Sequence, residues 1–295
     1  MSAGISAPLS DALAARLGSA VVRSSTVTGG DIHAAHRVQL RDGRDVFVKT
    51  NAAPEPTMFS CEASGLAWLA QAAALRTPRV LAVSDGGAGE PAFLALEWIE
   101  SGARGRAFDE ALGRGLAQLH RATPPGFGLS ADNYIATLPQ ANGPLPSWPR
   151  FYAERRLLPQ LARAARSGLA SAQLRAGIER VVERIDQLCG PAEPPARLHG
   201  DLWGGNALCD ASGAPVLIDP AVYGGHREVD LAMMRLFGGF GPRCFDAYAE
   251  VHPFADGHHE RVALYQLYPL LVHVNLFGGS YVQQVERALR TLGCA

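Results

Sequence analysis

The sequence predicts an α+β protein of two lobes, with a small β-rich N-terminal lobe and a larger, mainly helical C-terminal lobe. Short strand-like runs separated by glycine turns fill the N-terminal third, whereas apolar residues at helical spacing fill most of the remainder. A chain of 295 residues, 47% of them hydrophobic and 19% charged, has ample apolar surface for buried cores. We place the lobes at residues 1–99 and 100–295.

A β-hairpin pattern opens the N-terminal lobe. Residues 21–28 and 34–40 are typical of two strands, with Gly29 and Gly30 in the turn that joins them. Because glycine lets backbone amides approach an anion closely, Gly29 and Gly30 are candidate phosphate-binding residues. The remaining predicted elements of this lobe are strands over 46–49, 80–84 and 93–98, and a helix over 61–74.

The C-terminal lobe is predicted to be helical. In its first helix, Leu112, Leu116 and Leu119 fall on one face, as in an amphipathic helix packed on a core. A polar loop over 197–208 and a short strand over 216–218 interrupt the helical pattern. The predicted helices are 108–121, 148–164, 174–188, 229–237, 243–250, 259–276 and 279–292.

The stretch from His199 to Asn206, followed by Ile218-Asp219-Pro220, indicates phosphoryl-transfer chemistry. It places Asp201, Asn206 and Asp219 in the order in which protein kinases carry a base, a metal ligand and a second metal ligand. Carboxylate and amide oxygens suit Mg²⁺, which shares its coordination shell with phosphate. Either piece alone would more often be an ordinary turn. Together, at this spacing, they favour a kinase.

Lys49 is the single lysine among 27 basic residues. A compact ammonium can fit a phosphate contact that the broad guanidinium of arginine cannot, so a lysine retained at the end of a predicted strand indicates a phosphate ligand. Its survival by chance is the alternative. Kinases orient this lysine with a glutamate on a following helix, and Glu62 is the candidate, with Glu55 as the fallback. Glu62 would otherwise be a first-turn glutamate favoured by the helix dipole.

The segment before Ser101-Gly102 is the predicted hinge between the lobes. Glu97, Trp98 and Ile99 end the last strand of the first lobe. We expect adenine to stack among apolar side chains there and to hydrogen-bond to the backbone of these three residues.

Composition limits the partners and the compartment. A net charge of -1 gives no electrostatic reason to expect a nucleic acid or an anionic membrane as partner. The N-terminus shows no signal-peptide pattern, and no apolar stretch is long enough to span a bilayer. Five scattered cysteines without metal-ligand spacing are typical of free thiols in a reducing cytoplasm. Oligomeric state is not specified by any of these features.

Taken together, these motifs resemble the fructosamine kinase (ketosamine-3-kinase) family, within the aminoglycoside-phosphotransferase-like branch of the protein-kinase fold. Two positions depart from the expected pattern: Gly204 replaces a small polar residue, and His33 replaces Asn or Ser. The resemblance covers nearly the whole chain. The segments that carry it are 29–32, 132–135, 199–206, 218–221, 223–233 and 273–278.

The resemblance implies ATP-dependent phosphorylation of the sugar 3-hydroxyl of a small ketosamine, leading to deglycation. By matching positions, Asp201 would be the base, Asn206 and Asp219 would hold Mg²⁺, and Lys49, positioned by Glu62, would contact the ATP phosphates.

Other residues receive secondary roles from the same resemblance. His199 and Asp230 would support the catalytic loop, although Asp230 could simply cap a helix. Trp203 would face the sugar unless it is a core residue. His273 would contact substrate, whereas a satisfied core polar group is the usual meaning of a histidine on an apolar helix. Arg227 and Glu228 are expected to pair with each other.

Two other functions stay open at this point. A sister kinase acting on an aminoglycoside, choline or another amino alcohol would share the catalytic set but not the Trp203 segment or the Gly-His-Arg-Glu segment. A non-catalytic binding module would be expected to lose one of Lys49, Asp201, Asn206 or Asp219, and all four are present.

Overall fold

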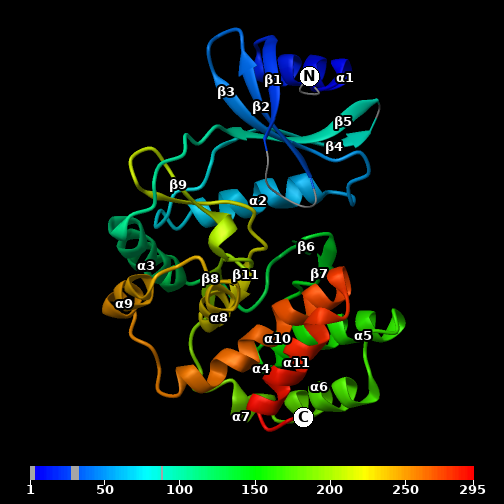
Figure 1. The fold of residues 1–295 in the computed structure, drawn as a ribbon, viewed down its shortest axis with the longest axis vertical. Helices are drawn as coiled ribbons and strands as arrows, with labels where there is room; N and C mark the ends of the chain where they lie inside the picture. The colour runs from blue at the N-terminus through cyan, green and yellow to red at the C-terminus, as the bar shows by residue number, and fades with distance from the viewer. Residues whose placement is uncertain (1–3, 28–32, 88) are drawn as a thin grey trace. The chain divides into compact units, whose positions relative to one another are not determined.

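The computed structural model describes residues 4–27, 33–87 and 89–295, which form two compact units (Figure 1). The first unit comprises Met1–Phe108 and Ala207–Pro220, and the second comprises Asp109–Asn206 and Ala221–Ala295. The mixed α+β class expected from the sequence is confirmed: the first unit is built on an antiparallel sheet, and the second is mainly helical.

The division between the units differs from the expected one at residues 99 and 100. Residues 207–220 return to the first unit because their hairpin bonds to it at several points. The amide of Gly102 donates to the carbonyl of Cys209 at 2.8 Å, and the amide of Leu217 donates to the carbonyl of Arg76 at 2.9 Å. These contacts join segments far apart in sequence, which local patterning does not reveal.

The first unit contains a five-stranded antiparallel sheet in the order β1-β2-β3-β5-β4. Its strands are β1 (Val21–Val27), β2 (Ala34–Leu40), β3 (Asp45–Thr50), β4 (Val80–Gly87) and β5 (Glu90–Glu97). Its helices are α1 (Ala7–Leu17) and α2 (Met58–Ala70), and the returning hairpin consists of β9 (Ala207–Cys209) and β10 (Pro215–Leu217).

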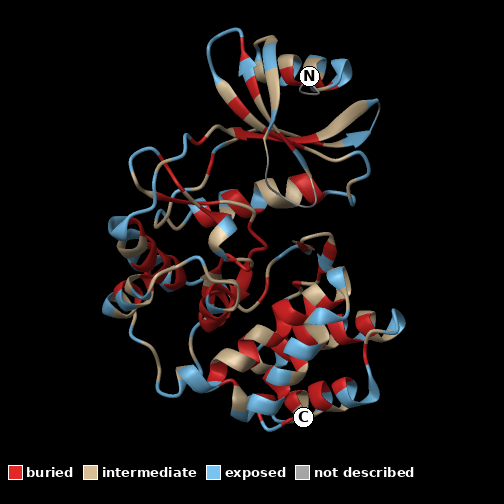
Figure 2. Ribbon diagram, in the orientation of Figure 1, coloured by how far each residue is buried: buried red, intermediate tan, exposed pale blue. Residues whose placement is uncertain are grey.

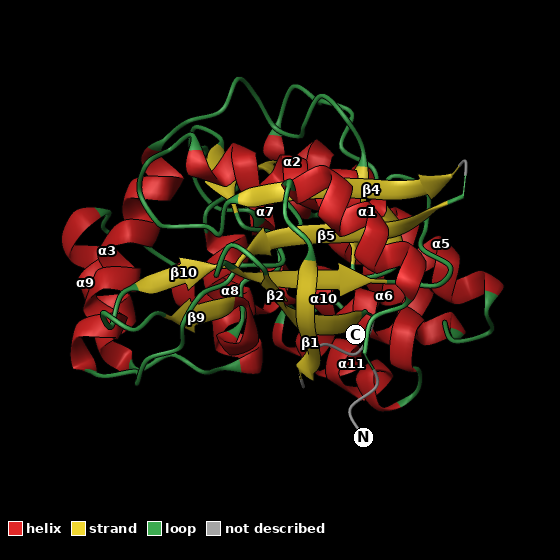
Figure 3. Ribbon diagram, turned by 90° about the horizontal axis from the view of Figure 1, so that it is seen from above, coloured by secondary structure: helices red, strands yellow, loops and turns green. Residues whose placement is uncertain are grey.

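The two faces of this sheet are covered by different helices. Val46 and Val48 of β3 belong to a core cluster with Leu9 and Leu13 of α1, and Figure 3 shows α1 lying along β4 and β5. Phe47, between the two valines, packs instead with the cluster that includes residues of α2. Since successive side chains of a strand alternate between faces, Lys49 lies on the α2 side.

Helix α1 was not among the predicted elements. It begins after Ser6, whose hydroxyl accepts the amide of Leu9 at 3.4 Å, and it ends at Gly18, whose φ of 71° suits the left-handed C-cap position. These start and stop signals are visible in the sequence, but the apolar spacing between them is weak.

The second unit is mainly helical, and buried residues line α10 at its centre (Figure 2). Helix α10 packs against α11, α8 and α5. The helices are α3 (Arg106–Arg121, which starts in the first unit), α4 (Trp148–Phe151), a π-helical segment (Tyr152–Leu157), α5 (Leu158–Arg166), α6 (Ala172–Glu183), α7 (Ile185–Leu188), α8 (Glu228–Phe237), α9 (Pro242–Val251), α10 (His258–Phe277) and α11 (Ser280–Thr291).

Small two-stranded sheets position the loops of this unit. They pair β6 (Asn133–Ile135) with β7 (Leu138–Gln140), and β8 (Ala196–Leu198) with β11 (Tyr223–Gly225). These three-residue strands were not predicted, since they are too short to show alternation. No helix in the described part of the chain is long and apolar enough to cross a membrane.

Candidate active site

Lys49 lies in the first unit between two carboxylates. Its Nζ donates to Oε1 of Glu62 at 2.8 Å and also forms an ion pair with Oδ1 of Asp219. Strand β3 presents Lys49 on its α2 side, while Glu62 follows the buried Phe59 by three residues on one face of α2. The structure therefore brings together the lysine and the glutamate that the sequence paired. Glu62 lies in the second turn of α2, which starts at Met58 rather than at Cys61.

The charges of this group do not balance internally. Burial alone would lower the pKa of Lys49, but the carboxylates of Asp219 and Glu62 outweigh burial and raise it above its ordinary value. Burial and the nearby charge of Asp219 raise the pKa of Glu62, against the opposing effect of Lys49. With both carboxylates ionised, one ammonium faces two negative charges. The excess is suited to a cation at Asp219, whose side chain is 39% exposed.

Asp219 has an uncommon backbone conformation. Its φ is 55°, in the left-handed region that a non-glycine residue rarely adopts, and Pro220 follows it. Such a conformation costs free energy and is characteristically found where function requires a side chain to be aimed in a particular direction.

The loop that carries Asp201, in the second unit, is held by a buried carboxylate. Oδ2 of Asp230 accepts the amide of His199 at 2.8 Å, and Oδ1 accepts the amide of Gly200 at 2.9 Å. His120, on α3, lies with Nε2 3.1 Å from Oδ2 of Asp230, while its Nδ1 is 2.9 Å from the hydroxyl of Tyr248. Asp230 therefore holds the start of the loop through two backbone amides, and His120 and Tyr248 in turn hold Asp230.

Asp230 remains ionised in this buried position. Burial would raise its pKa, but the hydrogen bond and charge of His120, together with the Gly200 amide, hold the pKa below its ordinary value. His120 and Tyr248 were not singled out from the sequence. Nothing local marks them, because they meet Asp230 only through the packing of α3, α8 and α9.

Gly200 is required by the close approach of a neighbouring segment. Its φ is 84°, and a Cβ at this position would overlap the carbonyl oxygen of Ala221. The amide of Ala221 donates to the carbonyl of His199 at 2.9 Å. The residues just before Asp201 are thus fixed by Asp230 and by the segment that starts at Ala221.

Asp201 and Asn206 lie together in the second unit. Nδ2 of Asn206 donates to the backbone carbonyl of Asp201 at 2.8 Å and to its Oδ2 at 3.1 Å. Because both protons of the amide nitrogen are directed to Asp201, the amide oxygen is the atom that this rotamer offers to a metal ion.

Trp203 is 42% exposed, so it is not the core residue that the alternative interpretation required. Its ring packs over Gly205, where a Cβ would overlap it. Gly204, one of the two departures from the family pattern, faces Gly239: a Cβ on Gly204 would come within 2.9 Å of the Gly239 Cα. The backbone amide of Gly204 also donates to the carbonyl of Gly238 at 3.1 Å. The missing side chain at Gly204 is therefore explained by backbone packing.

His273 lies in an aromatic cluster. Its ring centroid is 4.6 Å from that of Phe237 and 4.8 Å from that of Tyr281, and its Nδ1 is 2.8 Å from the carbonyl of Pro269. Burial lowers its pKa. The neighbouring Asn275 donates to Gln160. Nδ1 of His273 and Nδ2 of Asn275 therefore have partners within the unit, whereas Oδ1 of Asn275 is buried without one. A substrate contact by His273 stays a prediction.

The expected pairing of Arg227 with Glu228 is wrong. Arg227 instead donates to both oxygens of Glu193, at 2.8 and 2.9 Å, and Glu228 accepts from Arg261 at 2.8 and 2.6 Å. Adjacent residues at the start of a helix point in different directions, so each reaches a different segment. Both arginines also donate to carbonyls of the segment 252–256. Arg227 and the Arg261–Glu228 pair therefore connect residues 252–256 to the start of α8.

Two of the three predicted adenine-binding residues, Glu97 and Trp98, form other contacts in the structure. The amide of Glu97 donates to the carbonyl of Arg79 at 2.9 Å, and its side chain pairs with Arg76. The Trp98 ring lies under the guanidinium of Arg37, with 4.4 Å between its centroid and Cζ, and Ile99 is buried. Contacts of Trp98 and Ile99 with adenine stay predictions. Gly29 and Gly30 lie outside the described residues.

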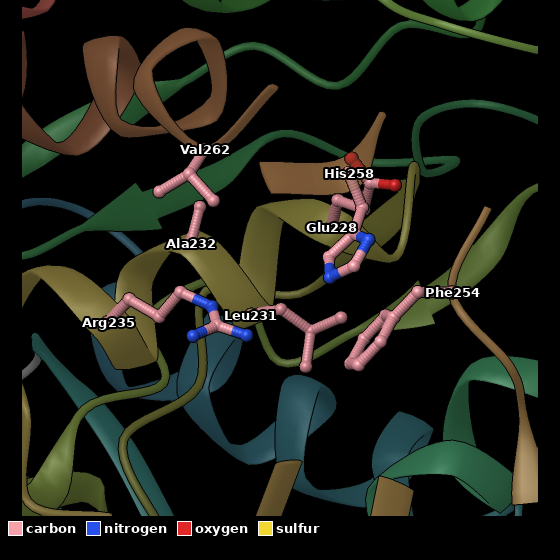
Figure 4. A pocket seen from close by; sticks show the side chains of 7 residues that line it. All are labelled: Glu228, Leu231, Ala232, Arg235, Phe254, His258 and Val262. Carbon is pink, nitrogen blue, oxygen red and sulfur yellow. The ribbon is translucent and has the colours of Figure 1, made fainter. Parts of the chain in front are cut away.

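Figure 4 shows a cavity of the second unit that involves none of the predicted site residues. It has a volume of about 10 Å³, room for roughly one water molecule. Its lining residues are Glu228, Leu231, Ala232, Arg235, Phe254, His258 and Val262.

Comparison with known proteins shows the family of the chain. The sequence model of the family described as fructosamine kinase matches residues 4–293. The chain belongs to the fructosamine kinase family. A Synechocystis relative named "Probable ketoamine kinase" is 41% identical over 272 residues, covering 90% of this chain and 88% of that protein.

Two further relatives extend the comparison. The rice (Oryza sativa subsp. japonica) protein named protein-ribulosamine 3-kinase, chloroplastic, is 38% identical over 87% of this chain and 75% of its own length. A crystal structure from Thermobifida fusca, assigned as a fructosamine-3-kinase, superposes with a TM-score of 0.89 at 39% identity, covering 97% of this chain and 99% of that one. Membership of a kinase family makes ATP the expected phosphate donor.

Proposed function

We propose that this protein is an ATP-dependent kinase that phosphorylates the sugar 3-hydroxyl of ketosamines, the adducts of sugars with amines. The observation that carries the proposal is the catalytic loop, in which the amide of Asn206 holds the carboxylate of Asp201 and Asp230 clamps the backbone in front of it. The relatives named as ketoamine and ribulosamine kinases support the choice of acceptor.

Asp201 is assigned the role of base. A positioned carboxylate takes the proton of the attacking hydroxyl, or orients that hydroxyl toward the γ-phosphate, and phosphoryl transfer requires little other covalent chemistry from the protein. The hydrogen bond from Asn206 restricts the carboxylate rotamer. His199 contributes through its ring, whose Nδ1 accepts the amide of Asp201 at 3.2 Å.

Lys49 is assigned to the ATP phosphates, with Glu62 as its orienting partner. The 2.8 Å contact fixes the ammonium on the α2 side of the sheet. Gly29 and Gly30 are proposed to contribute backbone amides to the same phosphates, and Trp98 and Ile99 to contact adenine.

Asn206 and Asp219 are the proposed ligands of Mg²⁺, each of a donor type that this ion takes. Asn206 offers an amide oxygen, Asp219 a carboxylate, and the group around Lys49 carries one negative charge more than it neutralises. When bound, Mg²⁺ would neutralise phosphate charge during transfer. Lys49 pairs with Oδ1 of Asp219, so a metal ion bound at that oxygen would compete with the ammonium, and a phosphate would compete with the carboxylate for Lys49.

The reaction would reverse glycation. A ketosamine 3-phosphate is unstable and decomposes, which frees the amine, as the resemblance implied. All five cysteines are free thiols in the structure, which supports the proposed cytoplasmic location. Trp203 and His273 are the proposed substrate contacts, with Trp203 presenting an exposed ring.

Coupled detection of ADP with a panel of acceptors tests the proposal. Fructosyl and ribulosyl amines should stimulate ADP release far more than the parent amine or the free sugar. An amine without sugar presents no hydroxyl to Asp201, and a sugar without amine loses the anchoring that aligns the reacting group. Turnover of an aminoglycoside or choline above that of every ketosamine would instead establish the sister-kinase function.

A further inference from the structure

The stretch 132–135 belongs to the family resemblance, yet none of the roles above uses it. It forms β6 and pairs with β7, and the hairpin carries two buried amide side chains. Nδ2 of Asn133 donates to the carbonyl of Val222 at 3.0 Å, and Nε2 of Gln140 donates to the carbonyl of Ala221 at 3.1 Å. The hairpin therefore reaches the backbone that follows Asp219-Pro220 in the chain.

These two carbonyls belong to the segment that supports the catalytic loop. The amide of Ala221 donates to the carbonyl of His199, and Gly200 has no room for a side chain against the Ala221 carbonyl. One residue further, Tyr223 of β11 pairs with Leu198 of β8. A displacement of residues 221–222 would therefore move the backbone that carries Asp201.

The side chain of Asn133 is linked through Asn142 to a buried arginine. Arg156, in the π-helical segment, is fully buried, and its Nη2 donates to Oδ1 of Asn142 at 2.7 Å. Asn142 in turn donates from Nδ2 to Oδ1 of Asn133 at 2.7 Å. The guanidinium carbon lies 3.8 Å from the ring centroid of Tyr223. Among the described residues, no carboxylate forms an ion pair with Arg156.

The chemistry of these groups sets the direction of the chain of hydrogen bonds. Arginine has donors and no acceptor, so Asn142 must turn its oxygen toward Arg156 and its nitrogen toward Asn133. The oxygen of Asn133 then faces Asn142, and its nitrogen faces Val222. A π-helical insertion, which is rare and frequently marks functional sites, places Arg156 at the start of this relay.

A second branch points the same way. The hydroxyl of Tyr268, on α10, donates to Oε1 of Gln140 at 2.7 Å, and Gln140 donates to Oδ1 of Asn133 at 2.8 Å as well as to Ala221. Burial raises the pKa of Tyr268 above its ordinary value, so its hydroxyl keeps its proton. Both branches therefore end with N–H groups on the carbonyls of residues 221–222.

We propose that Arg156 is a positioning residue for the catalytic loop, acting through the relay Arg156–Asn142–Asn133 on the backbone at Val222. The inference rests on the proposed function only in that the loop it positions carries the proposed base. A buried cation without a carboxylate is costly. Arg156 also donates to the carbonyls of Ala141 and Arg155, and its bond to Asn142 is the one that reaches the amides of the relay. In the relay, the guanidinium fixes which way the side-chain amides of Asn142 and Asn133 are turned.

Asn142→Asp is the decisive variant. It gives Arg156 a carboxylate partner, so the second unit should remain folded, but it replaces the N–H group directed at Asn133 with an oxygen. The carboxylate would repel Oδ1 of Asn133, to which Gln140 still donates, so Asn133 should shift and its bond to Val222 should weaken. We expect kcat to fall roughly 10- to 100-fold, as for a small misplacement of reacting groups, while KM for ATP stays near the wild-type value.

Gln160→Met is the matched control. Gln160 is another buried amide of the same unit, about one helical turn after Arg156. It accepts from Asn275, and among the described residues it forms no hydrogen bond to Asn142, Asn133 or Gln140. We expect this variant to lower Tm without lowering kcat. At the origin of the relay, Arg156→Lys keeps a side chain that only donates and should retain more of the wild-type kcat than Arg156→Met.

Hydrogen exchange provides a readout that does not depend on the acceptor. In Asn142→Asp without substrate, the amides of residues 198–206 should exchange faster than in the wild type, whereas in Gln160→Met they should not. Failure of every ketosamine as substrate would leave this measurement intact. The proposal is overturned by wild-type exchange and wild-type kcat in Asn142→Asp, or by an equal fall in kcat in Gln160→Met.

Discussion

Nζ of Lys49, on strand β3, donates a 2.8 Å hydrogen bond to Oε1 of Glu62, on helix α2. Two patterns of different period meet in this contact. The alternation of β3 sends Val46 and Val48 to one face of the sheet and Lys49 to the other, while the helical spacing of α2 places Glu62 beside the buried Phe59. The pair thus follows from sequence period once the helix is known to cover that face.

The first prediction concerns the geometry of the Lys49 side chain. Lys49→Arg keeps the charge but replaces a compact ammonium with a broad planar fork, in a position that is 6% exposed and lies between two carboxylates. We expect a folded protein whose kcat/KM for ATP falls on the order of 10²-fold, the range seen on removing one donor from a phosphate or oxyanion site. Steady-state kinetics at varied ATP measure it.

Amine-selective labelling is an independent check, because Lys49 is the single lysine. Labelling should inactivate the enzyme, and Mg·ATP should protect it more than a ketosamine does. Full activity in Lys49→Arg would show that the phosphate contact lies elsewhere.

The second prediction concerns Asp201. Asp201→Asn keeps the size of the side chain and removes the proton acceptor, so kcat should fall about 10²- to 10⁴-fold while ATP binding survives. Isothermal titration with a non-hydrolysable ATP analogue and coupled ADP assays separate the two effects. Asp11→Asn, an exposed carboxylate on α1, is the control. Near-wild-type kcat in a folded Asp201→Asn protein contradicts the assignment.

The elements that the sequence predicts correctly are those whose residue pattern lies within a single segment. The strand over 34–40 has the bounds expected, and the helix over 108–121 is only extended at its start. The order of Asp201, Asn206 and Asp219 predicted kinase chemistry because the same residue types follow one another at similar spacing in protein kinases.

The remaining parts depend on contacts between distant segments. His120 bonds to Asp230, 110 positions along the chain, and Arg227 bonds to Glu193 rather than to its neighbour. Strands β8 and β11 are three residues long and are defined only by each other. Local periodicity carries no signal for such pairs, since the partner is chosen by the packing of the helices that deliver it.

The third prediction concerns Asp219. Asp219→Ala removes the proposed metal ligand and frees Lys49 from one carboxylate, so both Mg·ATP affinity and rate should fall. Titration of activity with Mg²⁺ should show a higher half-saturating concentration than in the wild type. At a φ of 55° alanine is accommodated less readily than aspartate, so the substitution should also lower Tm somewhat. An unchanged Mg²⁺ dependence would place the metal elsewhere.

The last prediction concerns acid stability through His252. Burial is the main cause that lowers the pKa of His252 to about 4, and the charge of Arg227 lowers it further. His120 and Arg121 act in the same direction, whereas Glu193 opposes them. The His252 ring is neutral when folded but binds a proton near pH 6.5 when unfolded. The unfolded state therefore binds more protons as pH falls from 6.5 toward 4, and stability falls over that window and levels off below it.

We expect the Tm of the wild type to drop between pH 7.5 and pH 5, and the drop to be smaller in His252→Asn, which cannot bind the proton. His252→Gln is the matched companion, because glutamine also cannot bind the proton and should give the same smaller drop. Differential scanning calorimetry across the window measures both variants. An identical pH dependence in His252→Asn and the wild type would show that this ring contributes nothing to acid sensitivity.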